Sequence, residues 1–76
     1  MNISQLQILI TISRCGSFSD AALELGISQS AVSRAIAALE NELDVPLLVR
    51  GRFGAKLTSV GERIISHAQT IVDVRE

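Results

Sequence analysis

The stretch Ser17–Leu43, SFSDAALELGISQSAVSRAIAALENEL, contains two short amphipathic segments separated by Gly26-Ile27-Ser28. Ser17 followed by Asp20 is a helix start signal, and Gly26 suits the left-handed residue that ends a helix. Ser28 can cap the next helix, because its hydroxyl can accept a free N–H group of the first turn. The stretch therefore predicts two helices joined by a tight turn, which is a helix-turn-helix arrangement.

The second of these helices, expected over residues 29–43, has two different faces. One face is an apolar stripe formed by Val32, Ile36, Leu39 and Leu43. The opposite face carries Ser30, Arg34, Ala37 and Asn41, with Ser33 beside it and Gln29 in the first turn. A single helix with such polar side chains fits the major groove of DNA, whereas an ordinary solvated helix face is the alternative.

Similar signals place the other helices. Asn2 and Gln5 form a capping-box pattern before a helix expected from Ile3 to Arg14, which Gly16 would end. The helix at residues 29–43 should stop near Leu43, because Pro46 disfavours helical geometry at the preceding residue.

After Pro46 the pattern changes to two short strand candidates, Leu47–Arg50 and Ala55–Leu57, joined by a turn at residues 51–54 that has two glycines. A hairpin in this position is a wing. A last helix should begin at Thr58 or Ser59, where Ser59 and Glu62 form an S-x-x-E start signal. Neither Gly nor Pro stops it, so we expect the chain to end inside a helix, as a fragment of a longer protein would.

Apolar side chains outside the 29–43 stripe should complete one core. The expected members are Leu6, Leu9, Ile10, Ile12, Phe18, Leu23, Leu25 and Ile27, with Cys15 as a small core residue. His67 is isolated on the last helix, so we expect a structural histidine there and no metal ligand.

Composition sets limits on fold and location. The 76 residues suffice for one small domain, and a hydrophobic content of 47% excludes a disordered tail. The chain has no secretory signal pattern, no apolar run of about 18 residues, and one cysteine. We therefore expect no membrane partner and a cytoplasmic, nucleoid-associated location.

Charge is unevenly distributed along the chain. Seven Lys and Arg against eight Asp and Glu give a net charge of −1, although many DNA-binding domains are basic. Between Val45 and Gly61, however, lie Arg50, Arg52 and Lys56 without an acidic residue. A local positive patch on a nearly neutral body is the consequence.

Matches to one known family run in register from Met1 to the chain end. The strongest are Ser17-Phe18, Ala21-Ala22, Leu25, Ser28-Gln29, Ala31–Arg34, Ile36 and Leu39-Glu40, followed by Leu43, Val45, Leu47, Arg50, Leu57-Thr58 and Gly61-Glu62. With these residues the sequence resembles the N-terminal domain of LysR-type transcriptional regulators. The resemblance implies a mainly α winged helix-turn-helix at residues 1–57, three helices plus a two-stranded wing, then a linker and dimerisation helix at residues 58–76.

The resemblance also implies a C-terminal effector-binding domain outside these residues. We therefore expect no cofactor in this fragment and a small-molecule effector in the full-length protein. The implied partners are a second copy of the chain, with tetramers in the full-length protein, and double-stranded DNA. Two recognition helices about one DNA turn apart, near 34 Å, predict an inverted-repeat operator.

Side-chain chemistry and the resemblance together predict the contacts. Gln29 can bind the N6/N7 edge of adenine, Arg34 can bind guanine or phosphate, and Ala37 can touch a thymine methyl group. The expected DNA-binding residues are Ser28, Gln29, Ser30, Ser33, Arg34, Ala37, Arg50, Arg52, Lys56 and Thr58. The expected dimerisation residues are Ile64, Ile65, Ala68, Ile71 and Val72.

Other functions remain open on the residues alone. The chain has Ala35, Ala37 and Ala38 where family members often carry Gln, Arg or Lys, which leaves few side chains for reading bases. Together with the net charge of −1, this motivates a second hypothesis, a helical protein-interaction module without DNA binding. An enzyme is a distant third, because the sequence has no paired carboxylates, metal-ligand cluster or nucleophile–base arrangement.

Overall fold

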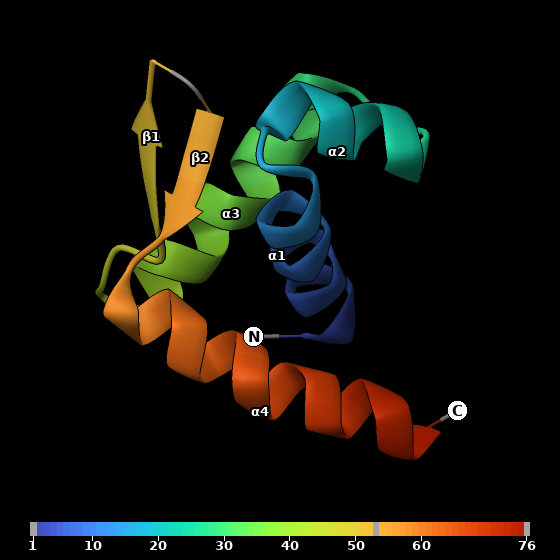
Figure 1. Cartoon of the computed structure of the whole chain (residues 1–76), viewed down its shortest axis with the longest axis vertical. Coiled ribbons are helices and arrows are strands. Elements are labelled where there is room, and N and C mark those ends of the chain that lie inside the picture. The colour runs from blue at the N-terminus through green and yellow to red at the C-terminus, as the bar shows by residue number, and fades with distance from the viewer. Residues whose placement is uncertain (1, 53, 76) are drawn as a thin grey trace.

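The computed structural model describes residues 2–52 and 54–75, with side chains described as far as residue 67. In chain order the elements are α1 (Ile3–Cys15), α2 (Phe18–Leu25), α3 (Gln29–Leu43), β1 (Leu48–Gly51), β2 (Gly54–Leu57) and α4 (Ser59–Arg75). Figure 1 shows α1, α2 and α3 packed together, the hairpin on one side and α4 across one end. The predicted mainly α winged helix-turn-helix, followed by a linker helix, is confirmed.

Local capping fixes the first three helices where the sequence predicts them. Asn2 and Gln5 form both hydrogen bonds of a capping box at the start of α1. The hydroxyl oxygen of Ser28 accepts the N–H of Ala31 at 3.0 Å and caps α3. Gly16 and Gly26 end α1 and α2 in the left-handed region, with φ of 83° and 70°. The predicted signals at these positions are confirmed.

Two helix boundaries have a different cause from the one predicted. Asp44, with φ 57°, adopts the left-handed conformation and its N–H donates to the carbonyl of Glu40, so α3 ends before Pro46 takes effect. A short polar residue tolerates this conformation better than most others. At the start of α4, the capping hydroxyl belongs to Thr58, which accepts the N–H of Gly61 at 3.0 Å. The predicted start of this helix at Thr58 or Ser59 is confirmed, since α4 begins at Ser59, but the residue that caps it is Thr58 and not Ser59.

The core lies between the first three helices, the base of the hairpin and α4. Its buried members are Leu9, Ile12, Phe18, Ala21, Ala22, Val32, Ile36, Leu39, Leu47, Leu48, Ala55 and Ile65. Cys15 and Leu25 are half-buried.

The prediction that Leu23 lies in the core is wrong, because its side chain is 81% exposed. The short helix α2 instead buries Phe18 and the two small side chains of Ala21 and Ala22. Ile27, also predicted to be buried, is 40% exposed in the turn.

The hairpin is tied to the helical body through backbone atoms. Strands β1 and β2 are antiparallel and pair Arg50 with Ala55 and Gly51 with Gly54, one residue longer than predicted at the turn end. The N–H of Ala55 donates to the carbonyl of Gly16 at 2.9 Å. At Gly54, with φ 124°, an added Cβ atom would lie 2.2 Å from that same oxygen, so only glycine allows this approach.

The base of the wing is joined equally closely to α4 and α3. Thr58 donates its N–H to the carbonyl of Leu47 at 2.9 Å and its hydroxyl to the carbonyl of Pro46 at 2.8 Å. The Glu40 carboxylate accepts the N–H groups of Leu47 and Leu48. The wing tip and α4 therefore lie at opposite ends of the molecule, as Figure 1 shows.

Candidate nucleic-acid interface

The start of α3, the start of α2 and the inner side of the wing meet at the end of the molecule opposite α4. They enclose an open hollow of about 160 Å³, whose lining includes Ser17, Phe18, Ser19, Gln29 and Arg50. The structure thus brings two of the predicted DNA-binding residues, Gln29 and Arg50, to one place. This juxtaposition joins the helix-turn-helix to the wing as one surface.

The free face of α3 is the one predicted from the helical spacing. Gln29, Ser30, Arg34 and Ala37 are exposed, whereas Ser33 is half-buried beside them. The hydroxyl groups of Ser28 and Ser30 lie 3.1 Å apart, and that of Ser28 also forms the helix cap. Small side chains dominate the rest of this face, since Ala38 is exposed and Ala35 is half-buried.

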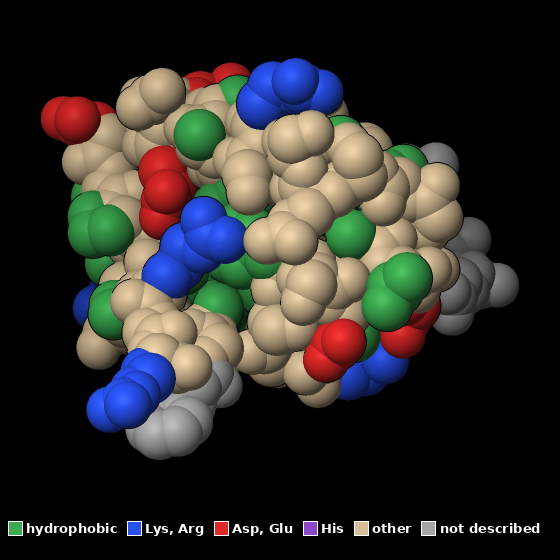
Figure 2. All heavy atoms as spheres, turned by 90° about the horizontal axis from the view of Figure 1, so that it is seen from above, with side chains coloured by type: hydrophobic (Ala, Val, Ile, Leu, Met, Phe, Trp, Pro, Cys, Tyr) green, Lys and Arg blue, Asp and Glu red, His purple; other side chains and the backbone are tan. Residues whose placement is uncertain are grey.

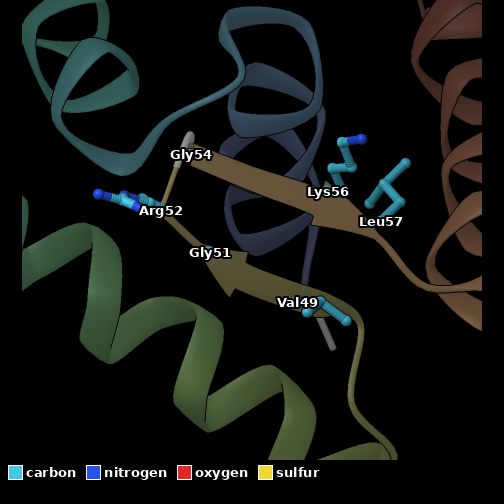
Figure 3. A pocket seen from close by; sticks show the side chains of 6 residues that line it. All are labelled: Val49, Gly51, Arg52, Gly54, Lys56 and Leu57. Carbon is cyan, nitrogen blue, oxygen red and sulfur yellow. The ribbon is translucent and has the colours of Figure 1, made fainter.

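The three basic residues of the wing lie in different environments. Arg50 faces the helical body, where its guanidinium carbon lies 3.9 Å from the ring centroid of Phe18. Arg52 is exposed at the turn, and Lys56 is exposed beside Val49 on the other side of the hairpin. Figure 3 shows Arg52 pointing away from Lys56 and Leu57. The wing therefore presents positive charge on its inner side, at its tip and on its outer side.

A larger hollow, about 430 Å³, lies along the outer side of the wing (Figure 3). Its lining combines two apolar side chains, Val49 and Leu57, with the basic residues Arg52 and Lys56. The arrangement includes no acidic residue, so the local charge of the hairpin is positive on this side as well.

The remaining predicted DNA contact, Thr58, has most of its hydrogen-bonding capacity in use. Its hydroxyl donates to Pro46 and accepts from the N–H of Gly61. A hydroxyl has one proton to donate, so Thr58 cannot also donate it to a phosphate without losing the contact with Pro46. The hydroxyl group of Thr58 therefore caps α4.

Two of the acidic residues are engaged in contacts away from the wing tip. Glu24 pairs with Arg14 at the side of α1 and α2, and Glu40 turns toward the backbone at the wing base. Figure 2 shows the end that carries the wing tip, with basic side chains over the wing and at the upper edge, and acidic ones around the edges and also beside the basic side chain nearest the middle. The positive patch predicted around the wing is therefore accessible.

The predicted dimerisation residues separate into two groups. Ile65 is 7% exposed and belongs to the core of its own chain, and Ile64 is half-buried against that core. Ala68, Ile71 and Val72 lie outside the residues whose side chains are described. His67 is exposed on α4.

Among residues 2–52 and 54–67, no group of His, Cys, Asp and Glu side chains could hold a metal ion. In the same part of the chain, none of the helices has the length and apolar character needed to cross a membrane. The sequence did not indicate that Ser17, Ser19 and Phe18 would line the hollow beside Arg50. The sequence predicts Phe18 as a core residue alone, because no local pattern reveals a contact between α2 and the wing.

Comparison with known proteins agrees with this geometry. Residues 3–62 match the family model described as the bacterial regulatory helix-turn-helix protein of the lysR family. The chain is 60% identical over 76 residues to the probable HTH-type transcriptional regulator LrrA of Synechococcus elongatus, covering all of this chain and 26% of the relative. It therefore spans about a quarter of the length of that curated relative.

Two solved structures show the same fold. One is the CbnR DNA-binding domain in complex with DNA, with a TM-score of 0.93 and 33% identity over 99% of this chain and 86% of that one. The other is full-length LysG of Corynebacterium glutamicum with bound effector Arg, with a TM-score of 0.91 and 40% identity over 99% of this chain and 26% of that one. The chain therefore belongs to the lysR family of bacterial regulatory helix-turn-helix proteins.

Proposed function

We propose that this chain is the sequence-specific DNA-binding domain of a dimeric LysR-type transcriptional regulator. The observation that carries the proposal is the single surface formed by the free face of α3 and the wing, where Gln29 and Arg50 line one hollow. An α-helix fits the major groove, and a basic hairpin beside it can reach the flanking backbone or minor groove. The CbnR structure of the same fold is a complex with DNA.

The two parts of the surface would have different tasks. Gln29 and Arg34 would read base edges, with Ser30, Ser33 and Ala37 close to bases or phosphates. Arg50, Arg52 and Lys56 would neutralise phosphates or enter the minor groove. Ser28 and Thr58 would hold helix starts close to the backbone of the DNA, with their hydroxyl groups largely used in capping.

Dimerisation would occur through α4, and the predicted residues Ile64, Ile65, Ala68, Ile71 and Val72 contribute unequally. The burial of Ile65 in its own chain leaves it little surface for a partner, so the half-buried Ile64 and the later residues would form most of the contact. Two copies would then bind an inverted-repeat operator. In a full-length protein, a C-terminal domain would bind a small-molecule effector, as LysG binds Arg, and would support tetramers.

Selection of bound sequences from random double-stranded DNA tests the proposal. We expect enrichment of an inverted repeat with half-sites about one helical turn apart, and binding that weakens steeply with salt. Failure to bind any duplex in a gel shift at low salt would contradict DNA binding. It would favour the alternative of a protein-interaction module.

A further inference from the structure

The wing and the helix-turn-helix are connected by a cation–π contact as well as by the backbone. The Arg50 guanidinium lies over the Phe18 ring, 3.9 Å from its centroid and well within the roughly 6 Å range of this interaction. Phe18 is only 6% exposed, so its ring is a fixed surface of the core. Arg50 is nevertheless exposed, so part of this residue is open to solvent.

The local structure fixes both partners of this contact. Phe18 is the first residue of α2, directly after the Ser17 cap. Arg50 pairs across the hairpin with Ala55, whose N–H donates to the carbonyl of Gly16. The ring and the guanidinium are therefore carried by two segments whose backbones are hydrogen-bonded next to the contact. A long arginine side chain that would otherwise sample many rotamers is held in one region.

We infer that Phe18 is a positioning residue for DNA binding. Its ring holds the Arg50 guanidinium at the rim of the hollow between α3 and the wing, where it meets a DNA phosphate. This inference rests on the proposed function, and it assigns to Phe18 a role beyond core packing. Arginine retains N–H donors while it stacks on a ring, so the same group can contact Phe18 and a phosphate.

Pre-organisation is the physical reason for the arrangement. A free arginine loses rotamer entropy when it binds phosphate, whereas a group already held in place loses less. Ser17, Ser19 and Gln29 line the same hollow and offer further hydrogen-bonding groups to an anion. Arg52 and Lys56 make no ring contact among the described residues, so Arg50 would be the ordered cation of the wing.

A double-mutant cycle in the whole chain tests the inference, with a duplex chosen by the selection experiment. Arg50→Ala should lower the salt slope of binding by about one unit per protomer. Phe18→Leu removes the aromatic face and should weaken binding about two- to fivefold at fixed salt. In the Arg50→Ala background, Phe18→Leu should cause no further loss of affinity, because the ring acts through Arg50.

Three further variants separate positioning from packing. Phe18→Tyr keeps the aromatic face and should retain wild-type affinity. Ile12→Val, a loss of core volume at a residue that does not line the hollow, should leave DNA binding unchanged. If Phe18→Leu is unfolded at the assay temperature by circular dichroism, Phe18→Met replaces it in the cycle. A loss of affinity from Phe18→Leu that persists in the Arg50→Ala background would overturn the inference.

An unchanged salt slope in Arg50→Ala would overturn it as well, provided that the wild-type chain binds DNA. A wild-type chain that binds no DNA would instead contradict the proposed function, so the two failures are distinguishable.

Discussion

The recognition helix α3 and the wing form the same surface with different kinds of side chain. The exposed face of α3 has one charged side chain in its first two turns, Arg34, and is otherwise made of short polar side chains and alanines. The wing has Arg50, Arg52 and Lys56 within a short hairpin. Phosphate contacts supply affinity that depends on salt, whereas base contacts supply discrimination. The helix should therefore determine which base sequence is preferred. The wing should determine the affinity of the complex and its dependence on salt.

The largest expected effect comes from detaching the wing at Gly54. In Gly54→Ala the new Cβ atom would lie 2.2 Å from the Gly16 carbonyl, at a φ of 124° that alanine rarely adopts. We expect the free energy of unfolding to fall by about 1–3 kcal/mol and the salt slope of DNA binding to fall with it. Thermal unfolding and binding at several salt concentrations measure the two effects.

Gly51→Ala is the matched control for this variant. Gly51 pairs with Gly54 across the hairpin, but a Cβ atom there has its nearest neighbour at 4.0 Å. It should keep stability and binding close to wild type. Equal losses in the two variants would show that the Gly54 contact does not hold the wing in place.

Removal of Arg34 should affect discrimination more than any other change in α3. If it forms a bidentate contact with guanine, Arg34→Ala should cost about 1–3 kcal/mol and flatten the preference at one base position. Binding to a panel of single-base variants of the selected operator measures both quantities. Asn41→Ala, also exposed but near the end of the helix, serves as the control. Unchanged affinity and preference would exclude Arg34 from base reading.

Substitutions in the outer wing should change the salt dependence of binding and not the base preference. Arg52→Ala combined with Lys56→Ala should lower the salt slope by up to about two units and leave the order of base preferences intact. Arg14→Ala also removes a positive charge, but Arg14 lies on α1 and is paired with Glu24 of α2, so the salt slope of this variant should not change. A change in base preference in the double variant would mean that the outer wing reads sequence after all.

The smallest effect is expected from a substitution that lengthens a side chain of α3. Ala37 is exposed, and Ala37→Gln adds an amide that can bind adenine. We expect a new base preference at one position of the operator, with affinities for the different bases within about tenfold of one another. The salt slope should not change. Ala35→Gln at a half-buried position is the contrast, and it should lower stability instead. An unaltered base preference for Ala37→Gln would place this part of the helix away from the bases.

Most of the helix boundaries could be predicted because caps are local. Asn2, Ser17 and Ser28 hydrogen-bond within three residues of themselves, and Gly16 and Gly26 act through their own dihedral angles. The prediction for Leu23 is wrong because burial in a helix as short as α2 depends on the elements packed against it. Where α1 and α3 pack against it, Ala21 and Ala22 occupy the interface and the larger leucine faces solvent.

The residues of the candidate site could be predicted from the sequence, but the contacts between them could not. The spacing in α3 was sufficient to place Gln29, Ser30 and Arg34 on the free face. The contact of Arg50 with Phe18 and the meeting of Gly54 with Gly16 join segments that are distant in sequence. Such contacts depend on the docking angle of the hairpin, which no local pattern encodes.

The junction between the wing and α4 has a mechanical consequence. Thr58 holds the carbonyl groups of Pro46 and Leu47, and the backbone of Gly61 lies so close to Leu47 that an added Cβ atom would be 2.3 Å from its oxygen. The junction is tightly packed, so α4 and the base of the wing should move together as one rigid unit. We therefore expect a partner that changes the direction of α4 to change the direction of the wing as well.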